Sequence, residues 1–488
     1  MKNTLLFICL LISVFASAQQ GILDATFGSS IPAGTQQYSN PSTGFFEKAI
    51  AFQSDGKIVI STGGGLVSLG RLKTDGSEDP YFASNGWKNV GNYAIRSIAV
   101  QSDGKILATG KPTVISYMDQ YLWRLNPDGS FDATFGQNGR VSDTTLGGSN
   151  ECLALLAGGE VMWSGVLGFR KLLSDGTTDA SWGNNGRLLA ANLPIYVSNI
   201  IADTISGYVI ASGYTKTLNN LAIIRLTPTG QVDPTFGYGG IDSLNYTVNT
   251  FGFRQELKLS PAGNIVLASD INDGLYNRVL CAVFNPDGTR NLGFGTNGAY
   301  IPIWNSPHEE TFFGGFGVKS DESILIACDA QDTTVSGSYY DVVTQRVKSD
   351  GTYDATYGIT RLDVNHANDL ADAGGIGPDG KFVIVGKSGG AQLLARYTDV
   401  INSVNDVQQS TLHIYPNPAS EVFSFEYSFT GNSILELIDL TGRIVMTKNL
   451  SADCTIHNIN VNGISKGMYV ITVRNEKATL FTERIAIE

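Results

Sequence analysis

Two stretches decide how this chain folds: IAVQSDGKILATG at residues 98–110 and RLNPDGSFDATFGQNG at residues 124–139. In the first stretch two apolar runs flank Asp103 and Gly104, and an Asp-Gly pair in that setting is a strong signal for a β-hairpin. The second stretch has an Asp-Gly turn of its own after a short apolar strand. Together the two hairpins predict about four short strands in about 55 residues.

The phrase DATFG in the second stretch recurs, with variants, about every 55 residues through most of the chain. Its copies begin at Asp24, Asp79, Asp132, Asp179, Asp233, Asn291 and Asp354. The fourth position is aromatic in every copy, namely Phe27, Phe82, Phe135, Trp182, Phe236, Phe294 and Tyr357. This pattern predicts one buried ring per unit as a structural repeat. We expect the leading Asp to accept a backbone N–H two residues on and so to close an Asx-turn.

The size of the unit matches a propeller blade of four strands better than a coil of a β-helix. The two ends of the array are complementary. The first phrase has no Arg-Leu strand before it, and the last such strand, at residues 393–397, has no phrase after it. A ring that closes by pairing its two ends within one blade leaves no exposed sheet edge. The sequence therefore predicts an all-β fold with a seven-bladed β-propeller over residues 19–400.

The N-terminus is typical of a secretory signal peptide. Lys2 precedes an apolar run at residues 5–15, and Ala16-Ser17-Ala18 is the small-x-small pattern of a cleavage site. Residues 1–18 are therefore predicted to be removed, and no later window is apolar enough for a transmembrane helix. The net charge of −12 argues against nucleic acid and anionic membranes as partners.

Four cysteines follow the signal segment, Cys152, Cys281, Cys328 and Cys454. They are far apart and form no C-x-x-C pair, so their spacing indicates neither a zinc site nor a dense disulfide framework. We expect each to be a small buried apolar residue, with a single disulfide as the alternative.

The last part of the chain has a different pattern. Residues 401–411 are polar and read as a linker. Beyond them Phe423, Phe425, Tyr427 and Phe429 alternate with other residues, as in a half-buried strand. Further strands are expected at residues 434–438, 443–445, 456–461, 468–473 and 480–487. This many strands in residues 412–488 predict a small C-terminal β-sandwich.

The combination of L-D-x-T-F-G-x-x-G, Q-x-D-G-K-I and R-L-x-x-D-G-S motifs resembles the delta-60 repeat family of bacterial secreted proteins. The resemblance covers residues 19–400. It implies a propeller-like β architecture and no shared catalytic activity.

Three motifs in the tail, YPNPAS at residues 415–420, LTGRIV at 440–445 and GMYVITV at 467–473, resemble the type A C-terminal sorting domain of the type IX secretion system of Bacteroidetes. The resemblance implies that the secretion machinery recognises residues 412–488 and carries the chain across the outer membrane. It also implies removal of the tail by a surface protease, followed by release or by attachment to lipopolysaccharide. The protein would then be secreted or lie on the outer-membrane surface. The alternative is a sandwich that merely binds carbohydrate.

Three segments partly match known dinucleotide-binding or metal-binding motifs, but each lacks a feature that its motif requires. Residues 375–380 fit G-x-G-x-x-G, but the next element is predicted to be a strand and not the helix that a dinucleotide needs. Residues 308–312 begin like a zinc motif but end in Phe312 instead of a second His. Residues 270–274 lack the later ligands of a calcium loop. We therefore expect no catalytic residue, no metal site and no cofactor.

The segments between the phrase and the first hairpin vary from unit to unit, and such loops commonly carry binding sites. The candidate ligand-binding residues in them are Tyr93, Tyr196, Trp304, His308, Glu309, His366 and Asn368. Aromatic and polar side chains of this kind suit hydroxyl-rich ligands. The alternative is that these are solvated loops with no ligand.

The sequence favours a non-catalytic propeller that binds a glycan or a protein, or that serves as a structural module. The alternative is an extracellular hydrolase or lyase that acts on polysaccharide with carboxylates at the propeller axis. Facing carboxylates with raised pKa values in a central pocket would favour the enzyme.

Overall fold

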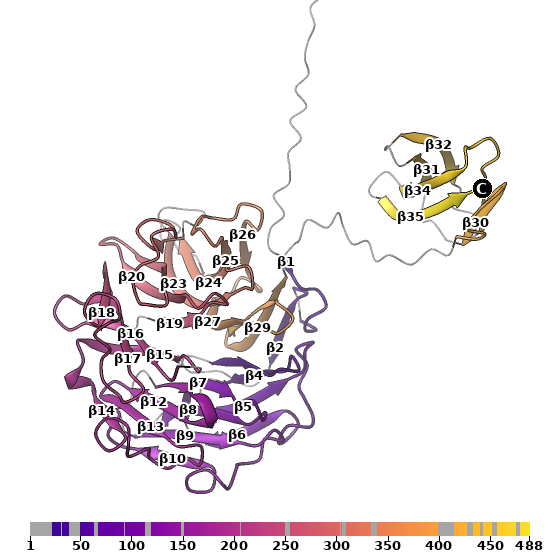
Figure 1. Cartoon of the computed structure of the whole chain (residues 1–488). Coiled ribbons are helices and arrows are strands. Elements are labelled where there is room, and N and C mark those ends of the chain that lie inside the picture. The colour runs from indigo at the N-terminus through magenta and orange to yellow at the C-terminus, as the bar shows by residue number, and fades with distance from the viewer. Residues whose placement is uncertain are drawn as a thin grey trace, which may run out of the picture. The chain divides into compact units, whose positions relative to one another are not determined.

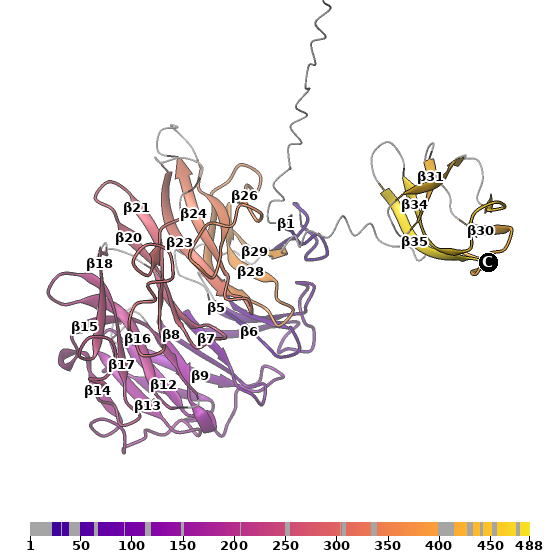
Figure 2. The same cartoon turned by 45° about the horizontal axis from the view of Figure 1, so that its top comes forward.

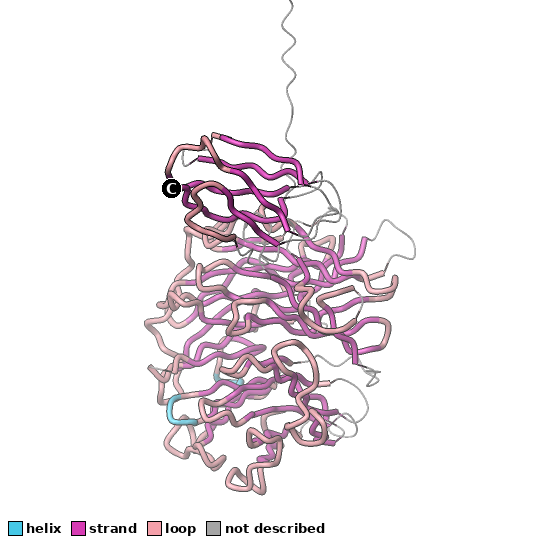
Figure 3. The backbone as a smooth tube through the Cα atoms, turned by 90° about the vertical axis from the view of Figure 1, so that its right-hand side faces the viewer, coloured by secondary structure: helices cyan, strands magenta, loops and turns pink. Residues whose placement is uncertain are grey.

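The computed structural model is almost entirely β-structure, as Figure 3 shows, with two short 3-10 turns at Ala157–Gly159 and Ala190–Asn192. It describes residues 22–30, 32–38, 49–62, 67–91, 93–112, 119–147, 151–204, 206–248, 254–302, 304, 309–332, 339–398, 414–426, 433–439, 443–450, 456–474 and 479–488. The chain divides into two compact units, Met1–Val400 and Ile401–Glu488. The predicted all-β fold class is confirmed.

The described strands of the first unit form seven antiparallel sheets, named here sheets I to VII in chain order. Sheet I has β3 (Ile50–Phe52), β4 (Ile58–Ser61), β5 (Val67–Leu72) and β6 (Trp87–Gly91); sheet II has β7 (Tyr93–Val100), β8 (Ile106–Pro112), β9 (Gln120–Leu125) and β10 (Arg140–Asp143). Sheet III has β11 (Cys152–Leu155), β12 (Val161–Gly165), β13 (Gly168–Leu172) and β14 (Arg187–Leu189); sheet IV has β15 (Ile195–Ala202), β16 (Val209–Thr215), β17 (Asn220–Leu226) and β18 (Ile241–Thr247). Sheet V has β19 (Gln255–Leu259), β20 (Ile265–Asn272), β21 (Asn277–Phe284) and β22 (Ala299–Tyr300); sheet VI has β23 (Glu309–Val318), β24 (Ile324–Asp332), β25 (Asp341–Val347) and β26 (Ile359–Leu362).

Sheet VII is built from both ends of the unit. Its strands are β27 (Asp369–Ile376), β28 (Phe382–Ser388) and β29 (Ala391–Thr398), and β1 (Ile22–Leu23) and β2 (Thr35–Tyr38) both pair with β29. Leu23 lies opposite Tyr397 and Tyr38 lies opposite Gln392. Figure 1 shows indigo β1 and β2 beside orange β29. The N-terminal strands therefore complete the sheet that the C-terminal strands begin, as the two incomplete ends predict.

The first strands of the sheets form a closed inner ring. Each of β3, β7, β11, β15, β19, β23 and β27 contacts the next in this order, and β27 contacts β3. Figure 2 shows the sheets arranged around this ring. Sheets I to VI add their remaining strands outward in chain order, and sheet VII does so with β28 and β29.

The copies that begin at Asp24, Asp79, Asp132, Asp179, Asp233 and Asn291 each dock on a turn of the following sheet. The Gly136 N–H donates to the Asp175 carbonyl at 2.8 Å, and the Gly28 N–H donates to the Asp75 carbonyl at 2.7 Å. A Cβ on Gly76 would lie 2.8 Å from the Phe27 ring, so the turn has room only for glycine there. Since this last contact joins sheet VII to sheet I, the repeated docking contact also closes the ring.

The carboxylate of the phrase binds a basic side chain on the third strand of its own sheet. Asp132 Oδ2 lies 2.7 Å from Arg124 Nε, and the Arg124 guanidinium lies 4.4 Å from the centre of the Phe135 ring. The Thr134 N–H donates to Asp132 Oδ1 at 3.0 Å, which is the expected Asx-turn. All seven phrase rings are at most 3% exposed: Phe27, Phe82, Phe135, Trp182, Phe236, Phe294 and Tyr357.

The second unit is a small sandwich of two sheets. β30 (Val422–Glu426) pairs with β33 (Ile456–Asn460), and β31 (Ser433–Asp439), β32 (Ile444–Leu450), β34 (Gly467–Arg474) and β35 (Thr479–Ile487) form the other sheet in the order β32-β31-β34-β35. Phe423 and Phe425 of the first sheet pack on Leu435, Ile471 and Ile485 of the second. This agrees with the predicted β-sandwich.

Cys152, Cys281 and Cys328 are free, buried thiols, whereas Cys454 lies outside the described residues. Burial raises the pKa of the Cys281 thiol well above its usual range. In the described part of the chain, no helix has the length and apolar character needed to span a bilayer.

Candidate functional site

A pocket of about 190 Å³ lies between the inner strands of the ring. Four of these strands carry a β-bulge beside it, with Arg96, Ser198, Gly314 and Asp372 as the extra residues. A bulge leaves one residue out of the ladder and re-aims its side chain, and bulges are common next to functional sites. Arg96, Ser198 and Asp372 line the pocket together with side chains from other inner strands.

The charged groups of this axial pocket form pairs of opposite sign. Arg96 Nε lies 3.2 Å from Glu151 Oε2, and Arg254 Nη2 lies 3.7 Å from Asp372 Oδ1. The side chains of Arg96 and Arg254 are 20% and 23% exposed, whereas those of Glu151 and Asp372 are 0% and 7% exposed. In these pairs a carboxylate faces a guanidinium and not another carboxylate, and the positive partner is the more accessible one.

Two carboxyl groups near the axis have raised pKa values. Burial raises the pKa of Glu256, although Lys258 Nζ lies 3.0 Å from Glu256 Oε1. Burial also raises the pKa of Asp329 to about 7. Asp329 is buried behind the inner strands, where its Oδ1 accepts the Ala371 N–H at 2.6 Å. It is therefore engaged by the backbone and is not a lining residue of the pocket.

The inner strands β23 and β27 approach each other closely beside the pocket. Arg254 Nη1 donates to the Phe313 carbonyl at 2.9 Å and to the Ala371 carbonyl at 2.6 Å, so one side chain from sheet V joins these strands. A Cβ on Gly315 would lie 2.2 Å from the Gly374 nitrogen. The glycines near residues 375–380 thus serve strand packing and a hairpin turn, and β28 follows them instead of a helix.

A larger groove of about 760 Å³ lies between β6 of sheet I and β10 of sheet II. We call it the β6–β10 groove; it is lined by Asn89, Val90, Gly91, Tyr93, Pro112, Trp123, Phe131, Gln137, Asn138 and Arg140. The Tyr93 ring packs edge-on against Trp123, with centroids 4.9 Å apart. Phe131 is 37% exposed, and Lys88 Nζ lies 4.2 Å from the centre of its ring. The groove therefore combines aromatic rings with amide and cationic groups.

The aromatic candidates from the sequence lie in different environments. Tyr93 lines the β6–β10 groove. Tyr196 is 40% exposed on β15, with Lys216 Nζ 5.5 Å from its ring centre. Trp304 is only 6% exposed and packs with Phe313 and Phe316, so it belongs to the core and not to a solvent-facing rim. Its size and apolar surface account for this position.

The polar candidates gather at the junction of sheets VI and VII, except His308, which lies outside the described residues. Glu309 is buried and its Oε1 binds the Arg361 guanidinium. His366 is exposed and its Nδ1 lies 2.8 Å from Asp363 Oδ2. Asn368 Oδ1 accepts the Tyr340 N–H at 2.9 Å.

Sequence reasoning missed the axial residues, although the repeats contain a signal for them. Arg96, Glu151 and Asp372 each stand eight positions before the glycine of the first hairpin turn in their units. At that position the residue type changes from unit to unit, while the residues around it keep the strand pattern. A comparison of the repeats at this offset would have singled out the axis.

Comparison with known families agrees with this architecture. Residues 413–488 match the secretion system C-terminal sorting domain, and residues 101–135 and 207–236 match the domain of unknown function DUF5122 β-propeller. This is a propeller-type protein with a type IX secretion sorting tail. A protein with this tail is secreted or lies on the outer-membrane surface, so the predicted localisation is confirmed. No curated protein matches the chain.

Three solved structures resemble this propeller protein at 10–15% sequence identity. PorZ, described as an essential surface component of the type IX secretion system of Porphyromonas gingivalis, has a TM-score of 0.27 and 10% identity over 90% of this chain and 74% of that chain. Hydrazine synthase of Kuenenia stuttgartiensis has a TM-score of 0.43 and 10% identity, covering 71% and 93%. A glucose dehydrogenase has a TM-score of 0.34 and 15% identity, covering 74% and 99%.

Proposed function

We propose that the propeller is a non-catalytic glycan-binding module and that the β6–β10 groove is its binding site. In this proposal residues 1–18 are a signal peptide, residues 19–400 are the functional part, and residues 401–411 link it to the sorting tail at 412–488. The secretion machinery recognises the tail, and a surface protease removes it.

The chemistry of the groove supports a carbohydrate ligand. The rings of Tyr93 and Phe131 offer faces on which the apolar side of a sugar can stack. Asn89, Gln137 and Asn138 carry amides, each of which can both donate and accept hydrogen bonds with hydroxyl groups. Aromatic faces beside amides are the single observation on which the proposal rests.

The pairing of charges at the axis favours binding over catalysis. A hydrolase needs one carboxyl group that is protonated near neutral pH and a second one at a suitable distance. At the axis Glu151 instead faces the guanidinium of Arg96, and Asp372 faces that of Arg254. The alternative function, a polysaccharide hydrolase or lyase, would have to use Glu256, whose pKa is raised by burial.

The test is a screen of the full chain against a neutral oligosaccharide array, followed by calorimetry with the best ligand and an assay for new reducing ends. We expect binding without turnover, and we expect Phe131→Ala to weaken it at least about tenfold, which corresponds to about 1.4 kcal/mol. Tyr196→Ala is the matched control, because Tyr196 is a similarly exposed ring that does not line the groove. Equal affinity of Phe131→Ala and the parent chain for the ligand would refute the β6–β10 groove as the binding site. Formation of product would favour the alternative function, a polysaccharide hydrolase or lyase.

A further inference from the structure

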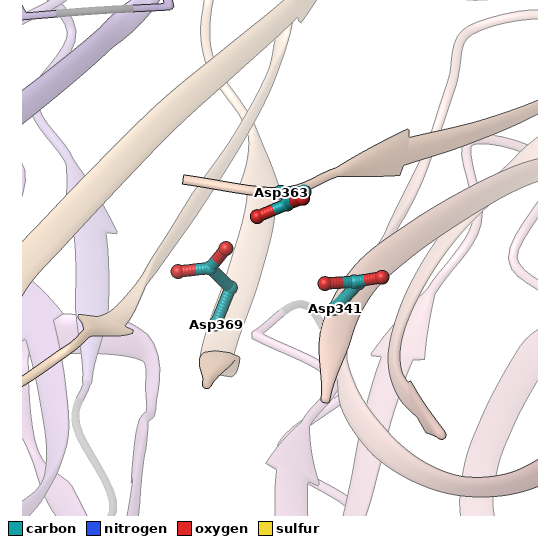
Figure 4. A group of neighbouring side chains, drawn as sticks. All are labelled: Asp341, Asp363 and Asp369. Carbon is teal, nitrogen blue, oxygen red and sulfur yellow. The ribbon is translucent and has the colours of Figure 1, made fainter. Parts of the chain in front are cut away.

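Three carboxylates from separate elements converge at the junction of sheets VI and VII. Asp341 begins β25, Asp363 follows the end of β26, and Asp369 begins β27. One carboxylate oxygen from each lies within 4.8 Å of those from the other two. Figure 4 shows the three side chains turned toward a shared space.

Asp369 is the buried member of this cluster, and one of its oxygens lacks a partner. The residue is fully buried, and Oδ2 accepts the Val364 N–H at 2.5 Å. Oδ1 is also buried and has no hydrogen-bond partner within the part of the chain that the structure describes. A buried carboxylate oxygen without a partner is costly, so it points to a group that would bind there.

The phrase carboxylates show what a satisfied buried Asp looks like in this protein. Asp79, which is 2% exposed, is held by Arg71 Nε at 2.8 Å. Asp369, in contrast, lies beside the carboxylates of Asp341 and Asp363.

The positive charge near the cluster is already engaged. Arg361 Nη1 lies 2.9 Å from Asp341 Oδ2, and Arg361 Nη2 binds Glu309. His366 Nδ1 lies 2.8 Å from Asp363 Oδ2 and is cationic only when protonated. In the ion pairs of the described residues, the guanidinium of Arg361 thus faces both Glu309 and Asp341, and no arginine faces Asp369.

We propose that Asp341, Asp363 and Asp369 bind a calcium ion. Ca²⁺ binds six to eight oxygens in a flexible geometry at about 2.3–2.6 Å, so ligands that come from three different elements suit it. Water completes the coordination on the side of Asp363, which is the exposed member of the cluster.

The ion would join sheet VI to sheet VII across the connection between them. Asp341 and Asp363 belong to sheet VI, whereas Asp369 begins the inner strand of sheet VII, which the N-terminal strands complete. Calcium would supply the positive charge that an arginine supplies to the phrase carboxylates. For a secreted protein, an affinity of about 10⁻⁴–10⁻³ M is sufficient.

The experiment uses the full chain, first stripped of metal with a chelator. Terbium emission sensitised by Tyr340, the neighbour of Asp341, reports binding, and added calcium is expected to quench it by competition. Thermal unfolding with 5 mM CaCl₂ is expected to show a melting temperature about 2–4 °C above that in chelator. Asp369→Asn should abolish both signals, and Asp363→Asn, at the exposed position, serves if Asp369→Asn does not fold.

Asp55→Asn is the matched control, because Asp55 is an exposed carboxylate on a hairpin turn in sheet I and should leave both signals unchanged. Absence of terbium emission and of a calcium-dependent shift in the parent chain would overturn the site. Retention of the shift in a folded Asp369→Asn or Asp363→Asn would also overturn it. An equal shift with MgCl₂ would overturn the assignment to calcium.

Discussion

The sheets of the propeller are alike where the phrase docks and unlike where they face the axis. At the docking contact, a phrase N–H donates to the turn of the next sheet, for example from Gly136 to Asp175 and from Gly295 to Asp350. At the axis, the bulges carry residues as different as Arg96, Gly314 and Asp372. The first region holds adjacent sheets together by repeating one contact, whereas at the axis the bulged residue differs from sheet to sheet.

Sheet V shows which part of the docking contact is essential. Val283 and Asn291 stand where the other sheets carry a basic residue and an aspartate. The Asn291 N–H still donates to the Val283 carbonyl at 3.0 Å, and Gly295 still docks on sheet VI. The backbone contact thus persists without the ion pair, and the two charges are absent together.

The largest effect is expected when one charge of a buried pair is removed. Arg71→Ala leaves Asp79 buried without its cation and should cost about 3–5 kcal/mol in the free energy of unfolding. Urea denaturation measures this cost. The double variant Arg71→Val with Asp79→Asn copies sheet V and should recover at least half of the loss. If the double variant is as unstable as the single one, the pair is not the reason that Arg71 matters.

The second prediction concerns the close approach of inner strands. Gly315→Ala should cost about 1–3 kcal/mol more than Gly274→Ala, measured by the same denaturation. Both glycines have a positive φ, but an added Cβ meets the Gly374 nitrogen at 2.2 Å in the first case and nothing within 4 Å in the second. Equal losses would mean that backbone strain alone sets the cost and that the strands can separate.

The third and smallest effect is a pH dependence of the docking region. Burial opposes ionisation of Asp132, but Thr134 and Arg124 hold the pKa of its carboxyl well below its usual range. Since the unfolded Asp has a pKa of about 3.9, the stabilisation is complete above that value and is lost as the pH falls toward the lower folded pKa. Asp132→Asn should therefore lessen the loss of stability between pH 5 and pH 2 by about 1 kcal/mol. Denaturation at several pH values measures this loss. If Asp132→Asn loses as much stability between pH 5 and pH 2 as the parent chain does, Asp132 is not the group responsible.

The fold was predictable because each unit repeats the same local signals. The Asp-Gly turns define hairpins, the aromatic position defines a buried ring, and the unpaired ends define how the ring closes. The site was predictable only in part. Tyr93 lines the groove, but its neighbours Trp123 and Arg140 come from strands that carried no signal for binding. Trp304 was predicted to bind a ligand but lies in the core, because a large apolar ring in a variable loop can pack inward.

The amino-acid sequence alone determined the repeated β-modules, the closure of the ring through its two ends and the sorting tail, because these follow from turn chemistry and from motifs within short segments. Only the tertiary structure decided which side chains meet at the axis, in the β6–β10 groove and around Asp369. These groups come from different sheets, and the distances between them depend on bulges, on glycine contacts and on how adjacent sheets pack.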